Sequence, residues 1–178
     1  MTQPDIEFRE AMARLASAVS IVTTDGNAGR YGITMSAVCS VSDTPPSLLI
    51  CVNSESGANA MIRQNGRFCV NVLRDEAVPL AKLFAAHGKT AEDRFSNGDW
   101  ELAPGGSPVL YDAAASFECR VVSEAKVGTH SVFFGEVQAL RTAAPAAGAL
   151  VYHRRAFHDI PADDPEAALV PNDWEIFG

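Results

Sequence analysis

Basic residues are scarce and long apolar runs are absent, and both features limit what this 178-residue chain can bind. It holds 14 Lys and Arg against 22 Asp and Glu, a formal net charge of -8. Nucleic acids and anionic membranes need a basic face that displaces counterions, so neither is an expected partner. No apolar run approaches the ~20 residues of a membrane helix, and the start MTQPDIEFRE lacks the basic-then-apolar order of a secretion signal. We therefore expect a cytoplasmic protein whose partners are small molecules and proteins.

Cysteine is also rare, and the motifs of several enzyme classes are missing. Cys39, Cys51, Cys69 and Cys119 are far apart and lie in apolar runs, whereas disulfide frameworks belong to small secreted domains and zinc sites need close pairs. We predict reduced, buried thiols and no metal site. The histidines show no HExxH spacing, and neither GxGxxG nor a P-loop occurs, so any nucleotide must be held in another way.

Short runs rich in β-branched residues dominate the rest of the chain. The expected strands are AVSIVTT (18–24), YGITMSAVCSVS (31–42), SLLICVN (47–53), GRFCVNVL (66–73), AASFECRVVSEAKV (114–127), SVFFGEVQAL (131–140) and ALVYHRRAFHDI (149–160). The first three follow one another closely and suggest a meander. Helices are expected from about Asp5, with Phe8 and Met12 on its apolar face, over ANAMIRQN (58–65), and over 75–86 with Pro79 in an early position. Residues 87–106 are expected to form an ordered surface loop anchored by Phe95 and Trp100.

This pattern of many short strands and few helices indicates the fold class. It favours a mainly β (α+β) fold, an antiparallel barrel with peripheral helices, over a doubly wound parallel sheet. We expect one domain over residues 1–160, followed by an acidic C-terminal arm over 161–178 in which Trp174, Ile176 and Phe177 dock on the domain.

One local feature has two interpretations. The strand 47–53 runs directly into SESG and a helix, so backbone N–H groups at the helix start, with the hydroxyls of Ser54 and Ser56, could bind a phosphate. Serine before a helix also commonly does no more than cap it. The local pattern leaves both interpretations open.

Several motifs, taken together and in order, resemble a known family. They are FREAMARLASAVSIVTT, the long block GITMSAVCSVSDTPPSLLICVNSESGANAMIRQNGRFCVNVL, and then EDRF, SFECRV, VGTHSVFFGEV and LVYHRRAFH, which span about residues 8–158. The chain resembles the short-chain flavin reductases with an FMN-binding split barrel. Within that family it is similar to the reductase components of 4-hydroxyphenylacetate 3-monooxygenase and of related phenol, chlorophenol and pyrimidine-degrading oxygenase systems, and also to a cobalt-corrinoid reductase branch.

The resemblance implies positions for a flavin. The isoalloxazine ring would lie along Gly32, Ile33, Thr34, Met35, Ser36 and Ala37, the phosphate would be held by Asn53, Ser54, Ser56 and Gly57, and Phe84 and Arg94 would border the outer half of the flavin. An extended backbone can recognise the alternating donors and acceptors of a flavin ring, and glycine permits close approach. The alternatives are a plain core strand over 32–37 and a surface ion pair for Arg94.

The resemblance also implies a nicotinamide site. His130 would lie beside the nicotinamide and orient it, although a lone loop histidine is more often structural or solvated. Tyr152, Arg154 and Arg155 could contact the nicotinamide or the diphosphate, although arginines at a sheet edge also discourage strand pairing. Arg9, in the N-terminal helix, is expected near the adenine end.

The expected activity follows from these positions. Hydride transfer from NADH, or NADPH, to FMN or FAD needs stacked rings and no acid–base dyad. We expect an NAD(P)H:flavin oxidoreductase, a homodimer with its flavin sites near the subunit contact, that supplies free reduced flavin to a separate aromatic-hydroxylating monooxygenase. The alternatives are a reductase with retained flavin acting on an acceptor such as a cobalt corrinoid, and a non-catalytic flavin-binding module.

Overall fold

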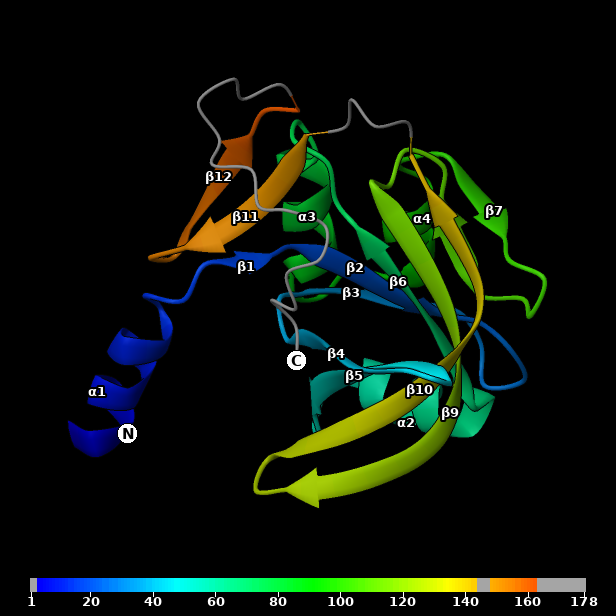
Figure 1. Ribbon diagram of the computed structural model, residues 1–178, viewed down its shortest axis with the longest axis horizontal. Coiled ribbons are helices and arrows are strands. Elements are labelled where there is room, and N and C mark those ends of the chain that lie inside the picture. Colours follow the sequence, from blue (N-terminus) through cyan, green and yellow to red (C-terminus); the bar gives the residue numbers. More distant parts are fainter. Residues whose placement is uncertain (1–2, 144–147, 163–178) are drawn as a thin grey trace.

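The computed structural model describes residues 3–143 and 148–162, so the predicted acidic arm lies outside the described residues from 163 onward (Figure 1). The helices are α1 (Gln3–Met12), α2 (Gly57–Asn65), α3 (Val78–Ala85) and α4 (Ala91–Phe95). The strands are β1 (Ser17–Ala18), β2 (Ser20–Thr24), β3 (Tyr31–Met35), β4 (Val38–Asp43), β5 (Pro46–Asn53), β6 (Arg67–Val72), β7 (Trp100–Leu102), β8 (Pro108–Leu110), β9 (Ala115–Val127), β10 (His130–Thr142), β11 (Ala149–His153) and β12 (Ala156–Ile160). Over the described ranges, no helix is both long and apolar enough to cross a membrane.

The main sheet has seven antiparallel strands in the order β3-β2-β6-β9-β10-β5-β4. Its two edge strands, β3 and β4, are joined by only two residues, Ser36 and Ala37, so the sheet must curl until its edges approach each other. The Cys51 N–H donates to the Ala37 carbonyl at 3.1 Å across this crossing. The predicted antiparallel split barrel is therefore confirmed. The predicted meander is wrong, because the hairpins β2–β3 and β4–β5 occupy opposite edges and the run 31–42 is divided at the crossing.

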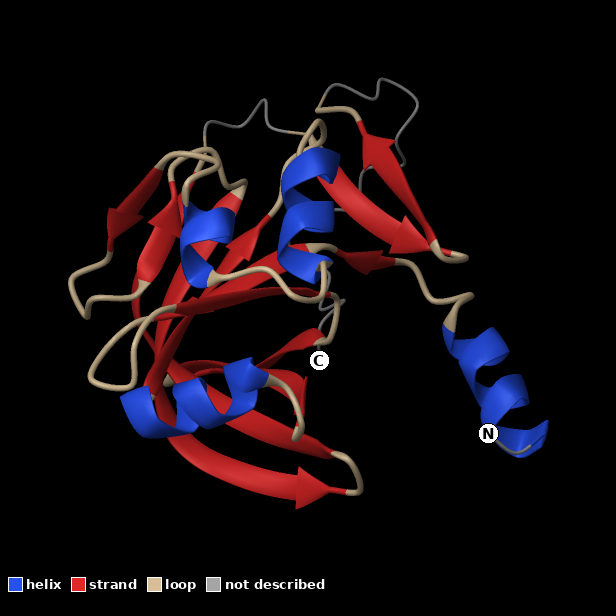
Figure 2. Cartoon of the chain, turned by 180° about the vertical axis from the view of Figure 1, so that it is seen from behind, coloured by secondary structure: helices blue, strands red, loops and turns tan. Residues whose placement is uncertain are grey.

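The interior of the barrel forms the first of two hydrophobic cores. Burial alternates along β5, where Ile50 points inward among Phe68 and Phe133, and α2 covers the end of the barrel with Ile62. Ser56 caps the start of α2, and Gly66 ends it in the left-handed region at φ 67°. Figure 2 shows α2 and α3 as two separate helices on the body of the molecule, and only α2 contributes to this core.

A second core lies on the outer side of β2. The five residues of β2 are all buried, without alternation, because Val22 faces the barrel interior while Ile21 packs with Ala81 and Phe84 of α3 and with Leu150 of β11. Pro79 takes the expected early position in α3. This second core attaches α3 and the last hairpin to the barrel.

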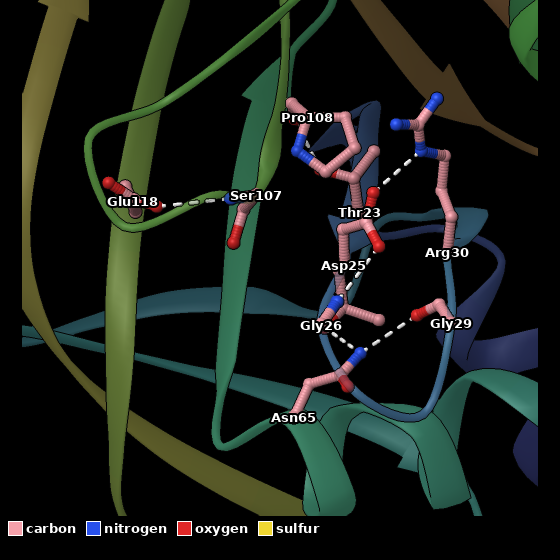
Figure 3. Close-up of polar contacts among 10 residues, drawn as sticks. Thr23, Asp25, Gly26, Gly29, Arg30, Asn65, Ser107, Pro108 and Glu118 are labelled. Carbon is pink, nitrogen blue, oxygen red and sulfur yellow. Dashed lines mark hydrogen bonds and ion pairs between the residues drawn. The ribbon is translucent and has the colours of Figure 1, made fainter.

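Side chains from distant elements fix the loops around β2, as Figure 3 shows. The Asn65 amide, at the end of α2, donates to the Gly29 carbonyl at 3.0 Å and so holds the β2–β3 turn. The Thr23 hydroxyl donates to the Pro108 carbonyl at 2.5 Å. The buried carboxylate of Glu118 accepts from the Ser107 N–H at 3.2 Å, which fastens the loop before β8 to the sheet.

Two expected elements differ from the structure. Residues 87–106 are not one loop: they contain α4, which a capping box between Thr90 and Asp93 nucleates, and the strand β7. The run 149–160 is not one strand but the hairpin β11–β12, which turns at Arg154 and Arg155 with φ of 50° and 63°. Such turns usually carry Asn or Gly, so the two arginines concealed this one.

Two expectations about exposure also need correction. Cys69 and Cys119 are buried, as predicted, but Cys39 is exposed on the edge strand β4. The predicted N-terminal helix is confirmed as α1, which projects from the body of the molecule (Figures 1 and 2) and leaves Phe8 and Met12 exposed.

Candidate functional site

A cavity of about 440 Å³ opens between β3, the C-terminal end of α3 and the last hairpin. It is lined by Val19, Thr34, Met35, Ser36, Lys82, Ala85, Ala86, Tyr152, Arg155 and Phe157. Five of the sequence-predicted site residues, Thr34, Met35, Ser36, Tyr152 and Arg155, thus come together from opposite ends of the chain. The cavity falls in the size range of small-molecule sites.

Strand β3 forms one wall of the cavity, and α3 holds it in place. The Thr34 hydroxyl donates to the Ala81 carbonyl at 2.7 Å, so this side chain is engaged with the helix. Ile33, on the other face of β3, packs against the core inside the barrel. A ligand in this cavity would therefore meet mainly the backbone of 34–36 and the exposed Ser36.

Three predicted flavin contacts lie behind this wall and not on its surface. Phe84 is completely buried, and a Cβ atom on Gly32 would lie 2.5 Å from its ring, so the close approach at Gly32 is to Phe84 and not to a ligand. Arg94 is buried as well, and its guanidinium donates to the Gly32 and Ala86 carbonyls. The flavin-bordering positions of Phe84 and Arg94 stay predictions, and in this structure both side chains are buried behind the wall. The alternative surface ion pair of Arg94 is wrong, because Arg94 is buried and its partners are backbone carbonyls.

The predicted phosphate turn lies between β5 and α2. Ser56 caps the helix, because its hydroxyl accepts from the Ala58 N–H at 3.3 Å, and the Asn53 side chain accepts from the Glu55 N–H at 2.9 Å. The buried Ser54 hydroxyl, in contrast, has no hydrogen-bond partner among the described residues. Gly57 lies against the Tyr31 ring, where a Cβ would meet ring carbon at 3.0 Å. Capping is thus present, and the hydroxyl of Ser54 is a buried polar group of this turn that no described residue satisfies.

His130 begins β10 directly opposite Asn53. The carbonyl of the preceding residue, Thr129, accepts a hydrogen bond from the Ser54 N–H at 2.9 Å. The Thr129 hydroxyl lies 2.9 Å from Nδ1 of His130. The imidazole is exposed. Because Cys51, two residues before Asn53, donates to Ala37, the β3–β4 crossing, the turn and His130 follow one another along one side of the barrel.

The arginines of the last hairpin face α1. The Arg154 N–H donates to the Ala13 carbonyl at 2.7 Å, and Arg155 pairs with Glu10 at 2.6 Å. These residues and Arg14 line a smaller cavity of about 240 Å³, which shares Arg155 with the larger one. Arg9 is exposed on α1 and lines neither cavity.

Sequence reasoning missed some lining residues. Lys82 lies on the same helical face as Ala85 and Ala86, which follow it by three and four residues. This helical spacing is the sequence signal from which Lys82 could have been predicted as a lining residue. Phe157 was hidden by the unrecognised hairpin turn. With Lys82 and Arg155, the larger cavity carries two cationic side chains in an acidic chain.

The chemistry of the site is that of binding and orientation. An apolar cavity with exposed backbone suits an aromatic ring system, and the start of α2 suits an anion. Within residues 3–143 and 148–162, no group of three or more His, Cys, Asp or Glu side chains could hold a metal ion.

Comparison with known proteins gives consistent results. Residues 12–161 match the model of the flavin reductase like domain family. The FMN reductase (NADH) RutF of Variovorax paradoxus S110 is 50% identical over 160 residues, covering 89% of this chain and 87% of that protein.

Two solved structures have the same fold. The NADH:FAD oxidoreductase SgcE6 of Streptomyces globisporus C-1027, in complex with NAD and FAD fragments, superposes with a TM-score of 0.83 at 27% identity, covering 94% of this chain and 99% of that one. The styrene monooxygenase flavin reductase of Pseudomonas putida S12 gives 0.75 at 26% identity, covering 86% and 97%.

Proposed function

Since this chain belongs to the flavin reductase-like domain family, we propose that it transfers hydride from NADH to FMN in the cavity between β3 and α3 and then releases the reduced flavin. The enzyme is an NADH-dependent FMN reductase, an oxidoreductase. Of the flavins and nicotinamides expected from the sequence, FMN and NADH are those of the half-identical relative. The SgcE6 structure extends the family's range to FAD.

The observation that carries this proposal is that the residues present fit the two ends of FMN. The cavity along 34–36 offers an apolar wall and free backbone to a ring system, and Ser36 leads through Ala37 toward the turn 53–57. There the unpartnered Ser54 hydroxyl and the start of α2 offer hydrogen bonds and a positive dipole end to a phosphate. We propose Thr34, Met35, Ser36 and Ala37 for the ring, and Asn53, Ser54, Ser56 and Gly57 for the phosphate.

The protein's part in the reaction is positioning. Bound flavin and nicotinamide supply the hydride chemistry themselves, which needs their rings stacked at about 3–3.5 Å. We propose that His130, oriented by Thr129, fixes the nicotinamide beside the flavin without transferring a proton. Tyr152 and Arg155 close the opposite side of the cavity, and we propose that Arg154, which lines the smaller cavity, would contact the dinucleotide phosphates.

Oxidation of NADH by the purified protein, followed by absorbance, tests the activity. We expect turnover that depends on added FMN; no turnover with FMN, FAD or riboflavin would refute the proposal. His130→Ala should slow hydride transfer while FMN affinity is largely kept, as a positioning role requires. Loss of FMN binding in that variant would mean that the role of His130 is misassigned.

The acceptor of the reduced flavin is a finer question. We propose a separate flavin-dependent oxygenase, because a relative of this fold is the reductase of styrene monooxygenase. Among the oxygenase systems of the family resemblance, we favour the pyrimidine-degrading class over the aromatic-hydroxylating one, because a relative that is 50% identical over 89% of this chain is a RutF reductase. Flavin retained through desalting, together with corrinoid-dependent turnover, would instead support the corrinoid alternative.

We also propose a homodimer. On the outer face of β5 and β10, Leu49 lies opposite Phe134 in a half-buried apolar surface, and α1 exposes Phe8 and Met12. A second copy of the chain would cover such apolar surface. Light scattering should give twice the chain mass, and Phe134→Glu should shift the protein toward the monomer.

A further inference from the structure

Arg94 of α4 is a buried cation held by carbonyl groups and an aromatic ring. It is only 6% exposed, its two terminal nitrogens donate to the carbonyls of Gly32 and Ala86, the latter at 2.8 Å, and its guanidinium carbon lies 5.2 Å from the centre of the Tyr31 ring. No described carboxylate forms an ion pair with it, and its Nε has no hydrogen-bond partner in the described part of the chain. Burying a charge in this way is costly unless hydrogen bonds and dipoles compensate it.

The two carbonyls belong to opposite walls of the 440 Å³ cavity. Gly32 lies on β3, two residues before the lining residue Thr34, and Ala86 is the C-cap of α3 and lines the cavity itself. The carbonyl at the C-terminal end of α3 also carries the negative end of the helix dipole, which favours a cation there. The planar guanidinium of Arg94 therefore connects the two walls on the side that faces away from the cavity.

We propose that Arg94 is a positioning residue that sets the distance between β3 and the end of α3, and thereby the width of the flavin cavity. The inference rests on the proposed function, because it assumes that this cavity holds the flavin ring. The rigid guanidinium fork donates to two carbonyls in fixed directions, whereas the three donors of a lysine ammonium rotate about one point charge. The Thr34–Ala81 hydrogen bond fastens the two walls earlier along α3, so removal of Arg94 loosens the end at Ala86.

A purely structural role for Arg94 makes a different prediction from a positioning role. If Arg94 only stabilised the fold, its loss would lower the fraction of active protein and leave the FMN affinity of the folded fraction unchanged. If it sets the cavity width, the affinity for FMN falls in the folded protein, and an added guanidinium ion that refills the site restores it.

The test uses the full chain with Arg94→Ala, Arg94→Lys and the control Arg120→Ala. Arg120 is an exposed arginine that pairs with Glu136 on the barrel wall, so its loss changes charge equally without touching the cavity. For Arg94→Ala we expect an FMN Kd raised between about 10- and 100-fold, as the loss of charge-assisted hydrogen bonds predicts, with kcat at saturating FMN within about twofold. Guanidinium should lower that Kd again, and Arg94→Lys should be intermediate.

Hydrogen exchange provides a readout that does not depend on flavin. In Arg94→Ala, amides of 32–36 and 84–86 should exchange faster than in the wild type, whereas those of β5 should not change. Wild-type FMN affinity in Arg94→Ala, or failure of both Arg94 variants to fold, would overturn the inference. If the wild type itself neither binds nor reduces FMN, the proposed function fails, and the exchange pattern alone then decides whether Arg94 holds the two walls.

Discussion

Each of the two hydrophobic cores contains a phenylalanine ring packed against a glycine, but the two contacts lie in different surroundings. In the barrel core, the ring of Phe68 covers Gly135, and in the outer core the ring of Phe84 covers Gly32; in both cases an added Cβ would lie 2.5 Å from the ring. Both phenylalanines are completely buried. Phe68, however, is surrounded by barrel strands, whereas Phe84 belongs to α3 and lies directly behind the cavity wall.

The two cores have different roles, since the barrel core stabilises the fold and the outer core also supports the cavity. The barrel core closes the sheet on itself and contains only barrel strands and α2 among its buried residues. The outer core joins α3 and β11 to β2, and the cavity lies where these elements meet β3. Damage to either core should cost stability, but only damage to the outer core should change the binding of the flavin ring, since the proposed phosphate site lies at the start of α2 on the barrel side.

The largest expected effect comes from emptying the two cores in turn. Phe68→Ala and Phe84→Ala should each lower the free energy of unfolding by about 3–5 kcal/mol, the usual cost of removing a buried phenylalanine. In addition, Phe84→Ala should raise the FMN Kd at least about tenfold, because β3 and α3 lose their shared contact. Urea unfolding and FMN titration measure the two quantities. Equal FMN affinity in the two folded variants would remove the distinction between the cores.

The two glycines should give smaller effects in a fixed order. Gly135→Ala places a methyl group 2.5 Å from Phe68 and 2.7 Å from the Cβ of Cys119, which cannot move away, so we expect a loss near 3 kcal/mol, at the upper end of the ~1–3 kcal/mol range for overpacking. Gly32→Ala, on an edge strand, should cost about 1 kcal/mol and weaken FMN binding by displacing β3. The reverse order in urea unfolding would show that β3 is the more rigid wall.

The sequence predicted the barrel core better than the outer one. The run SLLICVN is predicted as a strand, and the structure agrees, with Leu48, Ile50 and Val52 buried inside the barrel. Alternation is absent at β2, where both faces are covered, and the sequence of this short run does not show that α3 and β11 are the elements covering the second face. The hairpin at Arg154 was missed because its left-handed residues are arginines, which carry no turn signal.

The predicted site residues also fall into two groups, those that line the cavity and those buried behind it. Family resemblance named Ser36, Tyr152 and Arg155 as site residues, and the structure brings the three together in one cavity. It also named Phe84 and Arg94, which the structure buries behind the cavity, because a motif shows that residues belong together without showing which of them reach the surface. Only the hydrogen bonds of Arg94 to two walls reveal its position.

Two helix caps allow a comparison at a smaller scale. Ser56→Ala removes the cap of α2 beside the barrel, and Thr90→Ala removes the cap of α4 beside the outer core; each should cost about 1 kcal/mol. Ser56→Ala should raise the KM for FMN more than that for riboflavin, which lacks the phosphate. Thr90→Ala should change both KM values equally. An unchanged FMN-to-riboflavin ratio in Ser56→Ala would mean that this serine only caps the helix.

The smallest effect concerns two of the arginines that pack on aromatic rings, Arg94 and Arg63. Arg94 binds carbonyls, which do not titrate, whereas Arg63 of α2 lies over Phe133 and hydrogen-bonds Glu124, which lowers the pKa of that carboxyl to about 2 from its ordinary 4.5. Because the folded-state pKa is the lower one, the stabilisation is complete above about pH 4.5 and is lost as the pH falls toward 2. The pair is solvent-exposed, so the loss should stay under about 1 kcal/mol.

Glu124→Gln should abolish this acid-dependent part of the unfolding free energy and leave FMN affinity unchanged, because the pair braces α2 against β9 on the barrel side. Urea midpoints between about pH 6 and pH 2.5 measure it, with Glu136→Gln as the matched removal of one carboxylate from an exposed pair with Arg120. If Glu124→Gln weakened FMN binding as strongly as Arg94→Ala, the barrel side would also position the flavin ring, and the assignment of the ring position to the outer core alone would be wrong.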